Sequence, residues 1–260
     1  MMIRWVEANR IAMRCCIEGS GVPMVLVHQM GGAIESWSDV APLLSQSFQV
    51  IRYDQRGAGM SEKPVAIRFE DHLDDIAGLM DALGISGRCH VVGPAFGSTI
   101  AWGFGLRYPD RVRTRALASP PGREGPPEQM LRRWAERAVE VERGGMRSIE
   151  MSFASSFPQG FRGKLFDAHR LRWLGNAPGA VAAANRMLAG MNHQDWCGDP
   201  ACPVLILGCS EDPFRPAADV RALAGAIPGA IYAELSAGHY PHLQCPEAFA
   251  QAVGRFAAAH

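Results

Sequence analysis

The sequence lacks the features that direct a protein to a membrane, to nucleic acid or out of the cell. No segment approaches the roughly 18 apolar residues that a membrane span requires. Lys and Arg number 26, as do Asp and Glu, so no charge excess favours a nucleic acid or an anionic surface as partner. The opening MMIRWVEANR has no basic segment followed by an apolar one, as a signal peptide would. We therefore expect a cytoplasmic protein whose partner is a small molecule, with no nucleic acid and no membrane. A homodimer is left open.

Paired cysteines are also missing. The seven cysteines include no C-x-x-C pair, and no Cys and His residues cluster at the spacing of a metal site. The sequence therefore predicts reduced thiols, no metal and no cofactor.

Short apolar runs alternate with longer helical patterns along most of the chain. This alternation predicts an α/β fold with an eight-stranded, mostly parallel sheet flanked by helices. Runs such as MVLVH and PVLILG are apolar throughout, as expected for strands covered on both faces. The first two strands, joined by Asn9 and Arg10, are expected to form an antiparallel hairpin at the edge. Strands are expected near 4–8, 11–17, 24–28, 48–53, 88–93, 114–119, 203–208 and 230–235, and helices near 36–46, 69–83, 97–108, 216–226 and 246–258.

The pattern changes between residues 121 and 198. The segment opens with PPGREGPP, continues with amphipathic helical stretches and ends near GDPACP, without a strand-like run. We interpret 121–198 as a helical cap inserted into a core domain formed by residues 1–120 and 199–260.

The stretch VVGPAFGS (91–98) has the pattern of a strand, a sharp turn and a helix. Gly93 and Gly97 lie two residues before and after Ala95, which permits a tight reversal of the chain. The helix that follows directs its unpaired N–H groups at the same point, where they can stabilise an oxyanion. A plain strand-to-helix turn is the alternative.

Two later loops carry an acid and a base. Asp212 follows an apolar strand, at the edge where open α/β sheets place their sites, and Glu211 is its rival. His239 lies between a strand and the last helix, and histidine suits proton transfer near neutral pH; His242 is its competitor. The order 95, 212, 239 is the order nucleophile, acid, base of hydrolases with a nucleophile elbow.

On these segments, together with VLVHQMGG (25–32) and YDQRGAGMS (53–61), the chain resembles the α/β-hydrolase family over nearly its whole length. The resemblance implies that the backbone N–H groups of Met30 and Phe96 form the oxyanion hole. Gln29 stands where the family usually has glycine, and we expect its side chain at the mouth of the site. Trp134 and Trp196, two of the aromatic residues of the expected cap, are further candidates for substrate binding.

Ala95 departs from the family, which usually has serine at this position. We expect a hydrolase of the esterase or lactonase type, acting on a small carboxylic ester, lactone or related acyl bond with a Ser-His-Asp triad. Here Ala95 would replace the nucleophile in an inactive variant made to trap a ligand. A cofactor-free oxygenase or lyase that uses the His–Asp pair, and a non-catalytic ligand-binding protein, are the alternatives.

Overall fold

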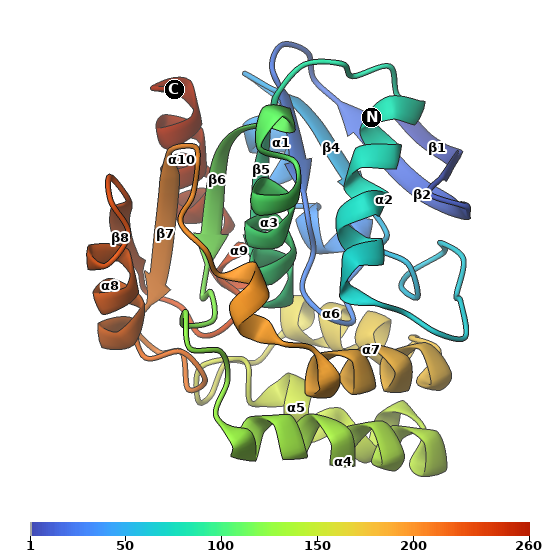
Figure 1. Ribbon diagram of the computed structural model, residues 1–260. Coiled ribbons are helices and arrows are strands. Elements are labelled where there is room, and N and C mark those ends of the chain that lie inside the picture. The colour runs from blue at the N-terminus through green and yellow to red at the C-terminus, as the bar shows by residue number, and fades with distance from the viewer. Residues whose placement is uncertain (1) are drawn as a thin grey trace.

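In the computed structural model, which describes residues 2–260, the chain begins with a hairpin at one edge of a sheet (Figure 1). Strands β1 (Met2–Ala8) and β2 (Ile11–Glu18) are antiparallel. Asn9 and Arg10 connect them with φ values of +46° and +64°. Two positive φ values in a two-residue turn match the right-handed twist of the flanking strands. The predicted hairpin is confirmed.

The eight strands form one sheet in the order β1-β2-β4-β3-β5-β6-β7-β8. Strand β2 is also antiparallel to β4, and every pairing from β4 to β8 is parallel. The predicted eight-stranded, mostly parallel sheet is therefore confirmed. The remaining strands are β3 (Pro23–Leu26), β4 (Gln49–Tyr53), β5 (Cys89–Pro94), β6 (Val112–Ala118), β7 (Val204–Cys209) and β8 (Ile231–Leu235).

Helices cover both faces of the sheet, which explains the strands that are apolar throughout. Val25 and Val27 point into one hydrophobic cluster, whereas Met24 and Leu26 point into another on the opposite face. The first cluster is completed by α2 (Phe69–Ala82), α3 (Phe96–Arg107) and α8 (Ala217–Gly225), and the second by α1 (Ala41–Leu44) and α10 (Pro246–Ala258).

Residues 121–198 contain helices and turns but no strand. In Figure 1 these helices lie together beyond the carboxyl ends of β6 and β7. They share a hydrophobic cluster that includes Phe153, Phe166 and Trp173, and Tyr240 and Leu243 join it from outside the segment. This arrangement suits a cap, and the boundaries at 121 and 198 stay a prediction. The elements are α4 (Glu128–Gly144), η3 (Met146–Ile149), α5 (Glu150–Ala154), α6 (Lys164–Leu174), α7 (Pro178–Gly190) and η4 (His193–Trp196).

The helix expected over 36–46 is not continuous. The chain forms a short 3₁₀ helix, η1 (Ile34–Trp37), and then the single turn α1. Pro42 has no N–H to donate and is tolerated only in the first turn of a helix, so a new turn begins there. Two further short elements, η2 (Pro109–Arg111) and α9 (Pro241–Gln244), also begin at prolines.

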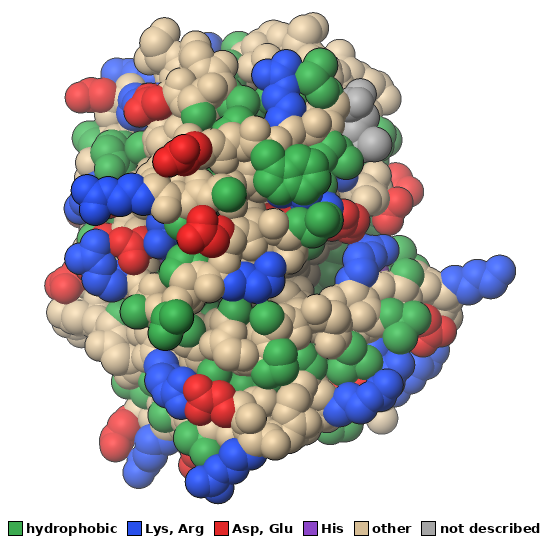
Figure 2. Space-filling model, turned by 90° about the vertical axis from the view of Figure 1, so that its right-hand side faces the viewer, with side chains coloured by type: hydrophobic (Ala, Val, Ile, Leu, Met, Phe, Trp, Pro, Cys, Tyr) green, Lys and Arg blue, Asp and Glu red, His purple; other side chains and the backbone are tan. Residues whose placement is uncertain are grey.

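The charged side chains on the face shown in Figure 2 are of both signs and interspersed. None of the helices formed by residues 2–260 combines the length and the apolar character that a membrane crossing demands.

Candidate active site

Ala95 occupies a strained turn between β5 and α3. Its φ of +50° and ψ of −119° lie in a region that residues with a Cβ atom rarely adopt. Its N–H donates a hydrogen bond to the carbonyl oxygen of Ala118, at 2.9 Å, which holds the turn against β6. The chain therefore has the backbone of a nucleophile elbow at the predicted position.

Gly93 and Gly97 are required by close backbone contacts at this turn. A Cβ atom on Gly93 would lie 2.1 Å from the carbonyl oxygen of Gly97. A Cβ atom on Gly97 would lie 2.1 Å from the carbonyl oxygen of Val27, in the neighbouring loop. Both contacts are far below van der Waals distance, so the glycines permit the tight approach of strand, helix and loop.

Asp212 and His239 meet at the carboxyl ends of β7 and β8. His239 Nδ1 lies 2.8 Å from Asp212 Oδ2, and the Asp212 carboxylate is fully buried. Its other oxygen accepts hydrogen bonds from the N–H groups of Phe214 and Arg215, at 2.9 and 3.1 Å. Burial raises the pKa of Asp212, but the hydrogen bond and charge of His239 outweigh this and leave that pKa below its ordinary value. Asp212 is thus an ionised carboxylate that orients the His239 ring.

Glu211 and His242, the alternative candidates for the acid and the base, are not part of this hydrogen-bonded pair. Glu211 is exposed. His242 is buried, and its Nε2 hydrogen-bonds to Gln29 Oε1 at 2.9 Å. Burial lowers the pKa of His242 well below its ordinary value, so its ring is neutral.

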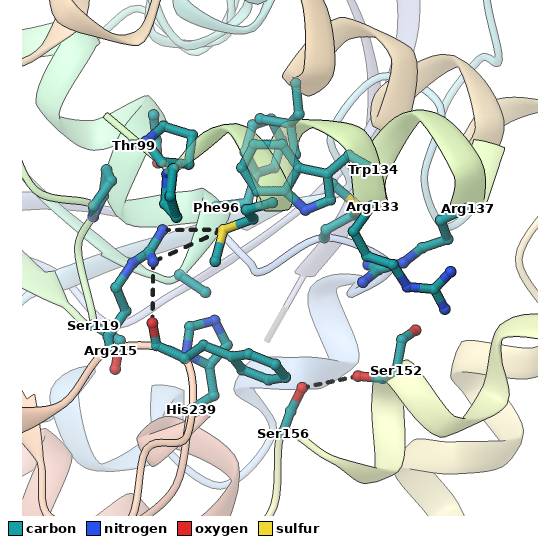
Figure 3. A pocket seen from close by; sticks show the side chains of 18 of the residues that line it. Phe96, Thr99, Ser119, Arg133, Trp134, Arg137, Ser152, Ser156, Arg215 and His239 are labelled. Carbon is teal, nitrogen blue, oxygen red and sulfur yellow. Dashed lines mark hydrogen bonds between the residues drawn. The ribbon is translucent and has the colours of Figure 1, made fainter. Parts of the chain in front are cut away.

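Ala95 and His239 line one cavity of about 840 Å³ beneath α4 (Figure 3). Nε2 of His239 makes no hydrogen bond to any of residues 2–260. This ring nitrogen and the apex of the turn therefore face the same space. A ligand in that space would contact both.

Met30 and Phe96 line the same cavity. Within the described chain, neither backbone N–H donates a hydrogen bond. The loop that carries Met30 is held from below, because His28 is fully buried and its Nε2 accepts a hydrogen bond from the N–H of Gln55, at 3.0 Å. Both N–H groups are available to a ligand oxygen.

Of the three predicted substrate-binding residues, one lines the cavity and two do not. Trp134, on α4, lines the cavity. Gln29 does not: its side chain turns inward to His242 and lies 3.4 Å from Ser36 Oγ, because a buried amide needs polar partners. Trp196 does not line it either, because its ring packs on Phe69 in the core, with centroids 5.2 Å apart. The expectations for Gln29 and Trp196 require this correction.

Several lining residues were not among the predicted site residues. Ser119 directly follows β6, has a φ of +48° and is 1 % exposed. Arg215 comes three residues after Asp212, and Arg137 lies on α4. The position of Ser119 just after a parallel strand was a usable signal. Arg137 belongs to a charged helical stretch with Arg132 and Arg133, whereas no sequence pattern marks Arg215. Among residues 2–260, no three His, Cys, Asp or Glu side chains are placed to hold a metal ion.

A family model described as the alpha/beta hydrolase fold matches residues 22–246. The chain belongs to this family. A curated member, the 2-hydroxymuconate semialdehyde hydrolase of Pseudomonas sp. (strain CF600), is 27% identical over 263 residues, covering 92% of this chain and 88% of the relative.

Two solved structures of the family are also similar. A thermophilic esterase from Thermogutta terrifontis, in its malate-bound structure, superposes with a TM-score of 0.90 and 26% identity, covering 100% of this chain and 99% of the esterase. An enol-lactonase from Burkholderia xenovorans LB400 superposes with a TM-score of 0.89 and 26% identity, covering 98% and 100%. These three relatives are a hydrolase, an esterase and an enol-lactonase.

Proposed function

We propose that the chain is a serine hydrolase of small carboxylic esters, lactones or related acyl bonds, with alanine in place of its nucleophile. Asp212 and His239 are the acid and the base, and the N–H groups of Met30 and Phe96 form the oxyanion hole. The enol-lactonase and esterase relatives support this class of substrate. The shape and the charges of the cavity lining determine which ester or lactone binds.

The observation that carries this proposal is the strained conformation of Ala95. Residues held in such regions cost about 1–3 kcal/mol, and they persist where function requires them. An alanine side chain has no polar group with which to use the cavity that it shares with His239. A serine there would place its hydroxyl beside the base that deprotonates it.

With serine at position 95, the reaction follows from the geometry. His239 takes the hydroxyl proton, and the serine oxygen attacks the acyl carbon. The N–H groups of Met30 and Phe96 stabilise the oxyanion, a contribution of about 2.7–4 kcal/mol per donor. The intermediate then collapses: the bond from the acyl carbon to the leaving oxygen breaks, and His239 gives its proton to that oxygen. Neutral again, His239 deprotonates a water that attacks the acyl-serine, and the acid is released as His239 returns the proton to the serine oxygen. Ser98 does not replace the serine, because it is buried and donates to the carbonyl oxygen of Ala95 at 2.6 Å.

Alanine removes the reaction without filling the site. It lacks the hydroxyl and adds no volume, so the cavity keeps its shape and its N–H donors. We therefore propose that Ala95 stands for a serine in an inactive variant made to hold its ligand uncleaved.

The variant Ala95→Ser tests this function. It should hydrolyse members of a panel of nitrophenyl esters and lactones, whereas the Ala95 protein should show no turnover above background. Released nitrophenol and lactone ring opening are the measurements. Equal rates in the two proteins would contradict a nucleophilic role for position 95.

The intact Asp212–His239 pair beside an alanine favours one other function. A cofactor-free oxygenase or lyase needs the pair for proton abstraction and needs no serine. Oxygen consumption with a hydroxylated aromatic compound, equal in the Ala95 and Ala95→Ser proteins, would support it. Absence of both activities would leave a ligand-binding protein.

A further inference from the structure

Four arginines line the cavity, and they fall into two pairs. Arg132 and Arg133 are neutralised by acids of their own helix. Arg132 lies 3.6 Å from Glu128, and Arg133 lies 2.8 Å from Glu140 and 3.7 Å from Glu136. These two arginines carry no charge that a ligand must balance.

The other pair, Arg137 and Arg215, has no carboxylate partner. Arg137 makes no ion pair or hydrogen bond with any of residues 2–260, and its Nε is buried. Arg215 contacts only weak or neutral acceptors: the sulfur of Met130, at 3.8 and 3.9 Å, and the carbonyl oxygen of Phe214, at 3.0 Å. Figure 3 shows Arg215 on one side of His239 and Arg137 on the other.

A partly buried guanidinium group without an ion pair costs free energy when no ligand is bound. Both side chains are partly buried, and burial lowers the pKa of each below its ordinary value. The charge of Asp212 acts on Arg215 and that of Glu140 acts on Arg137, but burial outweighs both, and neither arginine forms an ion pair with these acids in residues 2–260. Glu136, the acid that lines the cavity, is paired with Arg133. The cavity thus holds two partly buried positive charges that form no ion pair with the acids of residues 2–260.

We propose that this cavity selects esters or lactones that carry a free carboxylate, with Arg137 and Arg215 as its anchoring residues. A guanidinium and a carboxylate form charge-assisted hydrogen bonds, which are stronger than neutral ones and are strengthened further by partial exclusion of water. The inference rests on the proposed function, since it names the substrate class of the same site.

The test compares an ester that carries a carboxylate with its neutral counterpart. Monomethyl succinate, glutarate and adipate are titrated into the Ala95 protein by calorimetry, beside the corresponding dimethyl esters. The double variant Arg137→Gln/Arg215→Gln should bind the monoesters about tenfold or more weakly, because it loses charge-assisted hydrogen bonds. It should bind the dimethyl esters as before, which also shows that the cavity is intact.

The double variant Arg132→Gln/Arg133→Gln is the matched control. It removes the same charge from the lining of the same cavity, but from arginines that already have acidic partners, so it should keep the preference for monoesters. The inference is overturned if the Ala95 protein shows no preference for monoesters or binds none of them. It is also overturned if the preference survives in Arg137→Gln/Arg215→Gln.

The outcome is separable from that of the proposed function, because binding to the Ala95 protein involves no turnover. If Ala95→Ser hydrolyses nothing but the monoester preference depends on the two arginines, only the hydrolase proposal fails. If Ala95→Ser hydrolyses neutral esters and the preference is absent, only this inference fails.

Discussion

Outside the β1–β2 hairpin, the non-glycine residues with positive φ in the described chain, Ala95 and Ser119, lie together at the cavity. Both have positive φ without being glycine, both line the cavity, and they follow the adjacent strands β5 and β6. Each conformation is held by its N–H: that of Ala95 donates to Ala118, and that of Ser119 donates to the carbonyl oxygen of Leu207, both at 2.9 Å. Strain that the rest of the fold maintains at a cavity is typical of a reaction site.

At the scale of single residues, His239 and His242 should also differ in their effects on activity and on stability. In an Ala95→Ser background, His239→Ala should lower kcat by about three orders of magnitude or more, because the serine loses its proton acceptor. His242→Ala should lower kcat far less and should instead reduce stability, because it leaves the buried side-chain oxygen of Gln29 without its partner. Ester turnover and urea unfolding measure the two effects. The reversed order of kcat would show that the base is wrongly assigned.

At the scale of elements, local contacts could be predicted and distant ones could not. The β5–elbow–α3 unit follows from two glycines and an apolar run, all within a few residues. The side chain of Gln29 depends on His242, which is 213 residues away in sequence, so no local pattern indicates that it turns inward. The unpaired state of Arg137 likewise depends on which acids the fold brings near it. The break of the expected helix 36–46 has a local cause in Pro42, which lacks the N–H that a helix interior requires.

Gly97→Ala tests whether the elbow needs its close approach. The added Cβ would meet the carbonyl oxygen of Val27 at 2.1 Å, and a clash with backbone cannot be relieved by a side-chain rotation. The free energy of unfolding should fall by about 3 kcal/mol or more. Gly179→Ala, in α7, is the matched control: nothing lies within 4 Å of its added Cβ, so it should be neutral or slightly stabilising. Equal urea midpoints for the two variants would contradict the role of Gly97.

At the scale of the whole molecule, the buried hydrophobic residues fall into three clusters. Two lie on opposite faces of the sheet, and the third lies among the helices of 121–198. Tyr240, beside His239, belongs to the third cluster, so the loop that carries the base also packs against the expected cap. The helical pattern of 121–198 predicts helices but not the surface on which they pack. The apolar face of a helix does not specify which other apolar surface covers it.

The burial of histidine side chains should make the folded protein less stable in acid. Six of the eight histidines are buried and uncharged, and burial lowers the pKa of each: His28, His72, His90, His169, His193 and His242. For His72 that pKa falls to about 3, and both ring nitrogens are buried without a hydrogen-bond partner in residues 2–260.

The sign of the effect follows from proton binding. In the unfolded chain these rings bind protons below a pKa of about 6.5, whereas in the folded protein they do so only at lower pH. Stability is therefore fully present above pH 6.5 and is lost as the pH falls towards the folded pKa values. Between pH 7.5 and 5, His72 alone should lower the free energy of unfolding by about 2 kcal/mol. His72→Leu should shrink the difference between the two pH values by that amount. Urea unfolding of both proteins at both pH values measures it, and an equal loss in the variant would contradict the argument.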